Sequence, residues 1–401
     1  MKIHPALLAL FGMFPAILSA EILLKSPGPD ETITTMNPDL RAFLEKPRDE
    51  RRAIFDDPAK RLELNRIRDA KPVIFRWKCT DGEKGPFTVH FSEKEDFSES
   101  TPILVLPTSG SSVGEHPEIL SPEARVSNFL LGRTYYWKVE SPGTGGKPVV
   151  SATGRFQSDA FAPRQMSIPK VENVRDLGGR VGLDGRRVRQ GMIYRSAGLN
   201  HNSPDFDWDR KKWKKERIED FRIGDTKLTP AAVVYLNTVL GLKTDLDMRG
   251  PAEVAPMKES PAGPDVKWVH HSSSAYKAIF GFDAPGTTTG EGPEMMAKNF
   301  RIFCDRANYP IVAHCISGAD RTGAMAYVLN GVLGVDAEEL EKDWEITANS
   351  YFKYENFDDL AGGFAPFGKP SDPLHEKIAA YLLQIGITPE EIASYRAIML
   401  E

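Results

Sequence analysis

The sequence predicts an α/β domain, with a mainly parallel sheet flanked by helices, preceded by an all-β sandwich. From residue 163 onward, apolar strands alternate with amphipathic helices, as in a parallel sheet covered by helices. Between residues 72 and 161, short segments alternate apolar and polar residues and are separated by turn signals, which is typical of a sandwich. The length of 401 residues exceeds that of a usual single core, so two domains are expected.

The first twenty residues, MKIHPALLALFGMFPAILSA, have the layout of a secretory signal peptide. A lysine precedes an apolar stretch that ends in Ser19 and Ala20, and cleavage is expected after Ala20. The alternative is a buried N-terminal helix or an uncleaved anchor. We therefore expect an exported protein, periplasmic or secreted. No later segment is long and apolar enough to span a bilayer, so no transmembrane segment is expected in the mature chain.

Charge and cysteine content exclude several kinds of protein. The formal net charge of -5 argues against a nucleic-acid binder, which normally carries a basic excess. Cys79, Cys304 and Cys315 are an odd number, so at least one thiol stays unpaired. No cysteine or histidine cluster has metal-ligand spacing, so we expect no metal. A free thiol in an oxidising compartment suggests chemistry, while Cys304 also suits a small buried apolar residue.

Residues 21–71 are polar and charged, and we expect a helical lead-in broken at Pro47 and Pro58. In the region 72–161 we predict the strands PVIFRWKC, FTVHFS, RTYYWKVES and VVSATGRFQS. The early tryptophan, Trp77, and the late segments LLGRTYYWKV and SATGRFQS resemble a fibronectin type III domain. That resemblance implies a module that binds a protein or surface partner, without chemistry of its own.

The region 163–401 contains the alternating elements of the α/β domain. Helices are expected in PAAVVYLNTVLG, PEMMAKNFRIFCDRA and RTGAMAYVLNGVLG, and strands in LKTDLDM, VKWVHHS and YPIVAHC. Residues 201–228 contain a lysine-rich run, KKWKK, and are long for the family that the region resembles, as described below. This run either brings positive charge near a site or forms a solvated helix face. The aromatic, glycine-rich residues 350–370 form either a lid or a packed loop.

Residues 311–327, IVAHCISGADRTGAMAY, place a cysteine and an arginine between a buried strand and a helix. This position is the carboxyl edge of the sheet, where ligands bind, and the helix start directs amide groups at an anion. Gly318 permits a tight turn, and Arg321 offers a fork for two phosphate oxygens. These groups would lower the pKa of Cys315 below the free value of about 8.5 and aim a thiolate at phosphorus. The alternative is a structural cysteine beside a salt-bridging arginine.

The constellation of His314, Cys315, five residues, Arg321 and Thr322 resembles the signature of the cysteine-dependent protein tyrosine phosphatase superfamily. The segments NVRDLGG and GLKTDLDMRGPAEV resemble a bacterial-type subgroup that combines an NxRDLGG motif with this HCx5RT motif. The resemblance implies hydrolysis of phosphate monoesters, of phosphotyrosine or dual-specificity type, through a phosphocysteine intermediate and without a cofactor. The phosphate-binding residues would be Ile316, Ser317, Gly318, Ala319, Asp320 and Arg321.

Two aspartates are candidates for the general acid that such hydrolysis needs. Asp320 lies inside the loop beside Arg321, and Asp247 ends a neighbouring strand. Either aspartate would otherwise form an ion pair with Arg321 or Arg249. The resemblance further implies that His314 orients the loop and that Thr322 donates a hydrogen bond to the sulfur.

Residues of the NVRDLGG segment are expected to be structural. Asn173 and Asp176 suit turns, and Arg175 is expected to pair inside the fold.

Two other functions remain open. One is a phosphoinositide or inositol-phosphate phosphatase, and the other is a catalytically silent adaptor that binds phosphate. Members of the subgroup often carry lysine before the aspartate where this chain has Ala319, which weakens the case for polyanionic substrates. The complete set of Cys315, Arg321 and Thr322 argues against a silent protein.

Overall fold

The structure is a computed structural model of the chain. It describes residues 21–57, 59–60, 70–80, 85–105, 122–143, 147–169, 171–200, 206–207, 212–213, 228–254, 257–281, 291–351 and 357–401. The predicted signal peptide and most of the predicted insertion at 201–228 lie outside these ranges, apart from the short strands β13 (Phe206–Asp207) and β14 (Lys212–Trp213). Within the described ranges, none of the helices has the length and apolar character needed to cross a membrane.

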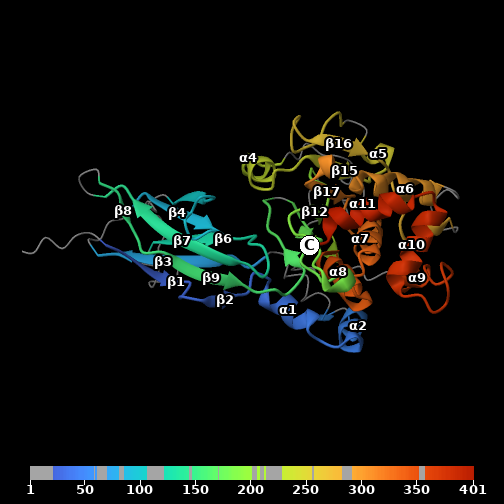
Figure 1. Cartoon of the computed structure of the whole chain (residues 1–401), viewed down its shortest axis with the longest axis horizontal. Helices are drawn as coiled ribbons and strands as arrows, with labels where there is room; N and C mark the ends of the chain where they lie inside the picture. Colours follow the sequence, from blue (N-terminus) through green and yellow to red (C-terminus); the bar gives the residue numbers. More distant parts are fainter. Residues whose placement is uncertain are drawn as a thin grey trace, which may run out of the picture. The chain divides into compact units, whose positions relative to one another are not determined.

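The chain divides into two compact units (Figure 1). The β unit comprises the chain up to Glu31 together with Ile74–Arg125 and Thr134–Gln157. The α/β unit comprises Thr32–Val73, Val126–Arg133 and Ser158–Glu401.

The β unit consists of two sheets around an aromatic core. One sheet has the order β1 (Ile22–Ser26), β3 (Val73–Cys79) and β6 (Glu123–Val126). The other contains β9 (Gly154–Ser158), β7 (Thr134–Ser141), β4 (Phe87–Ser92) and β5 (Thr101–Val105), with β8 (Val149–Val150) beside β7. Phe75 of the first sheet makes edge contacts with Phe91, Trp137 and Phe156 of the second. The two sheets therefore pack face to face, and the fibronectin type III resemblance stays a prediction.

The α/β unit is built on a six-stranded sheet flanked by helices, and the sequence analysis predicted three of the six strands. Its order is β10 (Arg164–Gln165), β11 (Arg175–Asp176), β12 (Ile193–Ser196), β17 (Ile311–His314), β15 (Thr244–Asp247) and β16 (Lys267–His270). The last four strands are parallel, and β10 and β11 form an antiparallel edge. The carboxyl ends of the four parallel strands share one edge, so β17 delivers Cys315 there.

Helices surround this sheet on both faces (Figure 1). The main helices are α4 (Pro230–Val234), α5 (Pro251–Val254), α6 (Glu291–Phe303), α7 (Asp320–Val332), α8 (Ala337–Tyr351), α9 (Phe357–Gly362), α10 (Leu374–Gln384) and α11 (Pro389–Met399). Shorter helical turns are η1 (Leu183–Gly185), η3 (Tyr235–Val239), η4 (Tyr276–Phe280) and η5 (Arg306–Asn308). The three predicted helices appear as α4 continued by η3, as α6 and as α7.

The alternation of side chains along β17 explains the two faces. Ile311 and Ala313 join the large core with residues of α6, α7, α10 and α11, whereas Val312 joins the core on the other face, with α4 and η3. All four residues of β17 are buried, as expected for a central parallel strand. Phe357 and Phe364 are also buried in the large core, so this part of residues 350–370 is packed rather than a lid, and residues 352–356 lie outside the described ranges.

The expected lead-in, residues 21–71, is shared between the units. It begins with a strand, β1, which the sequence analysis did not foresee, because its apolar residues pair with β3 of the β unit. After the short β2 (Glu31–Ile33) follow α1 (Pro38–Leu44) and α2 (Arg48–Asp56), whose apolar side chains cluster with Ile346 of α8.

Residues 126–133, expected inside the sandwich, also cluster with the α/β unit. Hydrogen bonds explain this: the side-chain amide of Asn128 donates to the Ser167 carbonyl and to the Tyr235 hydroxyl of that unit.

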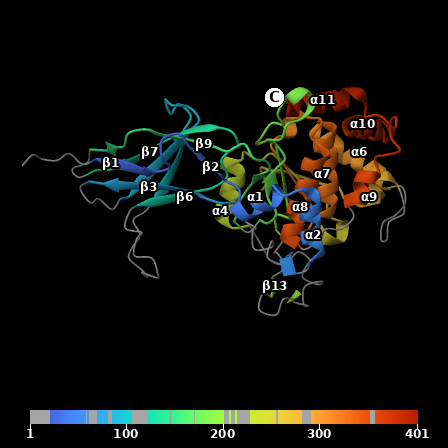
Figure 2. The same ribbon diagram turned by 90° about the horizontal axis from the view of Figure 1, so that it is seen from below.

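Charged pairs attach α2 to α8, the helix beside which it lies in Figure 2. Arg51 and Glu345 are completely buried, with 2.6 Å between Nε and Oε2. Around them, Arg48 and Arg52 both contact Glu341. Glu341 and Glu345 stand four residues apart on one face of α8, where a single facing helix can reach both.

The buried Glu345 makes stability depend on pH. Burial raises its pKa to about 7, although the charge of Arg51 opposes this, whereas an unfolded glutamate titrates near about 4.3. The folded chain therefore holds this proton more tightly, and the contribution to stability is lost as the pH rises through 7. In the parent protein, the free energy of unfolding should fall between pH 5 and pH 8. In Glu345→Gln this fall should be smaller by on the order of 2 kcal/mol, and urea unfolding at the two pH values measures it.

A matched control is Glu338→Gln on the same helix. Glu338 has a lowered pKa because it accepts a hydrogen bond from Arg51, so its influence on stability lies at acidic pH. This control should keep the decline between pH 5 and pH 8. An unchanged decline in Glu345→Gln would contradict the assignment.

Candidate functional site

The loop between β17 and α7, residues 315–319, turns its carbonyl groups outward; we name it the cysteine loop. The carbonyl oxygen of Ile316 accepts from the Gly198 amide at 2.8 Å, and that of Ser317 accepts from the Asn173 side chain at 3.0 Å. The Gly318 oxygen accepts from Nη2 of Arg195 at 2.6 Å. In a trans peptide the carbonyl and the following N–H point in opposite directions. The amides of residues 317–319 therefore point to the inside of the loop.

These inward amides form an anion-binding nest. Over the residues that the structure describes, no oxygen accepts a hydrogen bond from the amides of 317–319. Gly318 makes the turn possible: its φ is +68°, and a Cβ there would lie 2.3 Å from the Ser196 carbonyl oxygen. Consecutive unpaired N–H groups ahead of a helix start attract a negative charge.

Cys315 lies at the beginning of this nest and is 2 % exposed. Burial alone would raise the pKa of its thiol, but the charge of Arg321 and hydrogen bonds from the side chain and amide of Thr322 outweigh it. The net effect is a lowered pKa, which favours the thiolate. The buried Thr322 hydroxyl has no hydrogen-bond partner among the described residues, which leaves it able to donate to a thiolate at Cys315.

Arg321 presents one edge of its guanidinium group without a partner. Nη1 donates to Glu253 at 2.7 Å and to the Met248 carbonyl at 3.3 Å, and Nη2 donates to Glu253 at 3.2 Å. Of the five N–H bonds, the pair on the Nε–Nη2 edge is left without an acceptor in the described part of the chain. That edge has the spacing for two oxygens of one tetrahedral anion.

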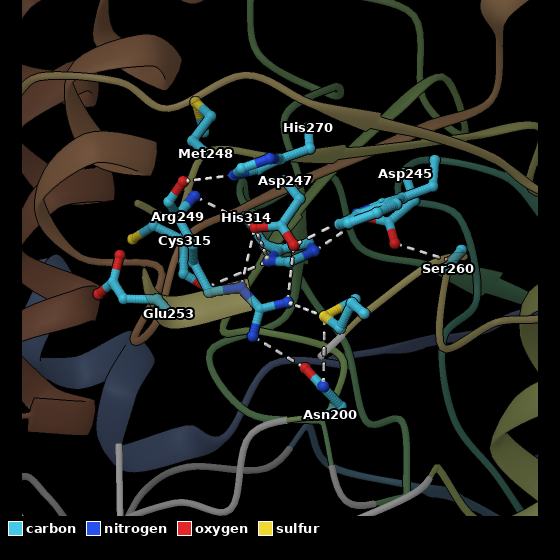
Figure 3. A network of polar contacts seen from close by, with 12 residues as sticks. Asn200, Asp245, Asp247, Met248, Arg249, Glu253, Ser260, His270, His314 and Cys315 are labelled. Atoms are coloured by element: carbon cyan, nitrogen blue, oxygen red, sulfur yellow. Dashed lines mark hydrogen bonds and ion pairs between the residues drawn. The ribbon is translucent and has the colours of Figure 1, made fainter. Parts of the chain in front are cut away.

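The His314 ring lies between two aspartates of β15 and the first carbonyl of the cysteine loop (Figure 3). Its Nε2 lies 2.8 Å from Oδ1 of Asp245, and its Nδ1 lies 3.1 Å from the Cys315 carbonyl oxygen. Burial opposes a charge on the ring, but Asp247 and Asp245 outweigh burial and raise the pKa of His314. A protonated ring donates from Nδ1 to the Cys315 carbonyl, so His314 fixes the first peptide of the loop.

Asp247 lies in the same network as an ionised, fully paired carboxylate (Figure 3). Arg249 donates to both of its oxygens, at 2.8 and 2.6 Å, and the Trp268 indole donates at 3.3 Å. Burial would raise the pKa of Asp247, but His314 and Arg249 lower it to about 2. The ion pair with Arg249, the alternative to an acid role in the sequence analysis, is what the structure contains. A group with so low a pKa holds no proton at neutral pH.

Asp320 is placed differently, as the first residue of α7 and partly exposed. Its Oδ1 accepts a hydrogen bond from the Tyr276 hydroxyl, which leaves Oδ2 for another partner. Tyr276, in η4, was missed in the sequence analysis, because it stands 44 residues before Asp320 and no motif marks it.

The NVRDLGG residues have the structural roles that their types indicate. Asn173 has a φ of +56° and its side chain holds the Ser317 carbonyl. Asp176 accepts from the Gly178 and Gly191 amides at 2.8 and 2.6 Å. Arg175 pairs with Asp343 of α8 at 2.9 Å.

A sequence profile of a tyrosine phosphatase family matches residues 166–225 and 220–361. A curated relative described as "Putative tyrosine-protein phosphatase", from Cupriavidus necator, is 26% identical over 238 residues, which are 54% of this chain and 76% of that protein. Together these matches support the cysteine-dependent tyrosine-phosphatase-like superfamily and a phosphatase activity.

Solved structures of a yeast phosphatase are also similar to part of the chain. The core catalytic domain of the PP-IP phosphatase SIW14 from S. cerevisiae, in complex with citrate, has 15% sequence identity and covers 43% of this chain and 86% of that chain, with a TM-score of 0.23. A second structure, of the Siw14 catalytic core, has 16% identity and the same TM-score of 0.23, and covers 43% of this chain and 85% of its own. At these scores the likeness carries no conclusion about substrate.

Proposed function

We propose that the chain is a phosphoric monoester hydrolase of the tyrosine phosphatase type that works through a phosphocysteine. The observation that carries this proposal is the closed cysteine loop, whose inward amides share one anion site with Cys315 and with the free edge of Arg321. A phosphoryl group is the tetrahedral anion that such a nest and a bidentate arginine fit. The substrate class that we favour is phosphotyrosine or dual-specificity monoesters.

In the first step, the Cys315 thiolate attacks phosphorus. The S–P bond forms while the bond from phosphorus to the ester oxygen breaks, and the bonding electrons pass to that oxygen. The loop amides and Arg321 stabilise the non-bridging oxygens, where negative charge is concentrated. Asp320 gives its proton from Oδ2 to the leaving oxygen.

In the second step, water hydrolyses the phosphocysteine. Asp320, now ionised, accepts a proton as the water oxygen bonds to phosphorus and the S–P bond breaks. The thiolate regains the electron pair, and the Thr322 hydroxyl donates to it, which makes sulfur a better leaving group. Inorganic phosphate then leaves the nest.

Asp320 is favoured over Asp247 as the acid because it is partly exposed and keeps one oxygen free. We expect Asp320→Asn to lower kcat/KM, which reports the first step, by about 10²- to 10⁴-fold on phenyl phosphate and much less on p-nitrophenyl phosphate, because a good leaving group needs little protonation. Asp247→Asn is the matched variant, and it should lower activity equally on both substrates through loss of the Arg249 pair. Initial rates on the two esters test this, and equal losses in Asp320→Asn would count against the assignment.

The function itself is tested with the full chain, in the presence of a chelator, on a panel of monoesters. We expect hydrolysis of p-nitrophenyl phosphate and of phosphotyrosine peptides, and a higher kcat/KM on the peptides than on inositol phosphates or phosphoinositides. The reverse order would assign the chain to inositol substrates. Absence of any turnover combined with phosphate binding would identify a silent adaptor.

One residue favours the first substrate class. Ala319 is buried and supplies no cation at the position where related loops carry lysine. A polyanionic substrate would gain less at such a site than at one with an additional positive charge.

The proposal includes export and a binding role for the β unit. Export rests on the signal-peptide pattern of residues 1–20, and N-terminal sequencing of the mature protein tests it. The resemblance of the β unit to fibronectin type III domains supports a protein or surface partner, and a pull-down with the whole chain tests that role.

A further inference from the structure

Three arginines of the α/β unit converge on one carboxylate behind the cysteine loop. Arg175, Arg180 and Arg195 are each almost completely buried, and so is Asp343 of α8. Asp343 accepts from Nε of Arg175 at 2.9 Å, from Nη2 of Arg180 at 3.1 Å and from Nη1 of Arg195. We name these four residues the arginine cluster. The mechanism above uses none of them directly.

The arginine cluster carries more positive than negative charge. Three guanidinium groups face one buried carboxylate, and the nearest other anion, Glu339, lies 3.8 Å from Arg180 and is one-third exposed. Nε of Arg195 and Nη1 of Arg180 have no hydrogen-bond partner among the described residues. Burial and the charge of Arg195 lower the pKa of Arg175 to about 9. The neighbouring guanidinium groups therefore repel one another in a site that excludes water.

Hydrogen bonds connect the arginine cluster to three adjacent carbonyl groups of the loop. Arg195 donates from Nη2 to the Gly318 carbonyl at 2.6 Å and to that of Ala319 at 3.5 Å. Arg175 donates to Oδ1 of Asn173 at 2.6 Å, and the same Asn173 side chain holds the Ser317 carbonyl. Because the carbonyl and the following N–H of a trans peptide point in opposite directions, these contacts aim the amides of residues 318 and 319 into the nest.

We propose that Arg195 is a positioning residue for the thiolate: it holds the Gly318 and Ala319 carbonyls outward and supplies buried positive charge that keeps Cys315 ionised. The inference rests on the proposed function, since it concerns the nucleophile of that reaction. Arg195 touches neither the sulfur nor the substrate site, so it acts through the loop peptides and through its field. A purely structural arginine would affect stability without changing the ionisation of the sulfur.

The test is the pH dependence of alkylation of Cys315 by iodoacetamide. Cys79→Ala and Cys304→Ala are introduced together so that only Cys315 reacts. On this background, we expect Arg195→Met to raise the pH midpoint by about one unit, which is about a tenfold smaller thiolate fraction below the midpoint. Arg195→Lys keeps the charge and loses the fork, so its midpoint should rise less while kcat/KM on p-nitrophenyl phosphate still falls.

The matched control is Arg51→Met, which removes a buried arginine paired to Glu345 on the same helix α8. It should lower the melting temperature without moving the midpoint. An unshifted midpoint in folded Arg195→Met would overturn the inference. If that variant does not fold, Arg195→Lys decides, because unchanged kcat/KM and an unchanged midpoint there also overturn it. A parent protein in which Cys315 titrates like a free thiol would instead refute the proposed function.

Discussion

Replacement of Cys315 by serine is expected to abolish phosphate ester hydrolysis, with a loss of about 10⁴-fold or more in kcat. A serine hydroxyl stays protonated under the conditions in which Arg321 and Thr322 hold the thiol ionised, so no nucleophile remains. The nest and Arg321 are retained, and binding of inorganic phosphate should persist. Release of p-nitrophenol measures the first effect and calorimetric titration with phosphate the second.

The other cysteines provide the controls for this prediction. Cys304→Ser should keep near-normal activity, because burial raises the pKa of that thiol to about 12 and it lies outside the loop. Cys79→Ser, in the β unit, should likewise keep near-normal activity. In the parent protein, rapid quenching with substrate should trap one phosphoryl group on Cys315, detected by peptide mass. Full activity in Cys315→Ser would end the proposed mechanism.

Replacement of Arg321 by lysine is expected to lower kcat/KM by about 10²- to 10³-fold. Lysine keeps the charge but loses the planar Nε–Nη2 edge and the bidentate contact with Glu253. Arg321 is also the strongest of the influences that lower the pKa of Cys315. Because lysine keeps this charge, the acidic limb of the kcat/KM profile should stay near its parent position in Arg321→Lys. Arg321→Met removes the charge and should move the limb to higher pH, because the thiolate forms later.

A profile of kcat/KM between pH 4 and pH 9 measures both effects. The matched control is Arg301→Lys on α6, an exposed arginine that pairs with Glu391 at 2.9 Å. That variant should reproduce the parent profile. A lower plateau with an unmoved acidic limb in Arg321→Met would separate phosphate binding from thiol ionisation and contradict the second role.

Local patterns predicted the elements that surround the proposed anion site. Strand and helix periodicity placed β17 and α7, and the spacing of Cys315 and Arg321 across that junction indicated the anion site. Both features are local, because a strand, a tight turn and a helix start follow one another in the chain. The outward carbonyls of the loop were not predictable, since their partners, Asn173 and Arg195, are more than a hundred residues away.

Contacts between distant segments account for most of what the sequence analysis missed. On α8, Glu339, Asp343 and Thr347 recur every fourth residue and so share one face, which the sequence could have revealed. This face contacts Arg175, Arg180 and Arg195. That contact depends on how β11 and β12 reach the loop, which the sequence does not show. The choice between Asp247 and Asp320 likewise depended on partners, Arg249 and Tyr276, that only the folded chain identifies.

The chain enters the α/β unit at Thr32, leaves it at Val73 and returns for good at Ser158. The two units are therefore interleaved along the chain, because the β unit also holds the residues up to Glu31. Starting the chain later cannot remove the β unit without also removing Thr32–Val73 of the α/β unit. A protease that cuts once between Ile74 and Arg125 would leave a two-piece enzyme, joined only by non-covalent bonds such as those from Arg51 and Arg52 to α8. Deleting all residues before 163 would remove α1 and α2 from the surface of α8 and expose Glu345 to water.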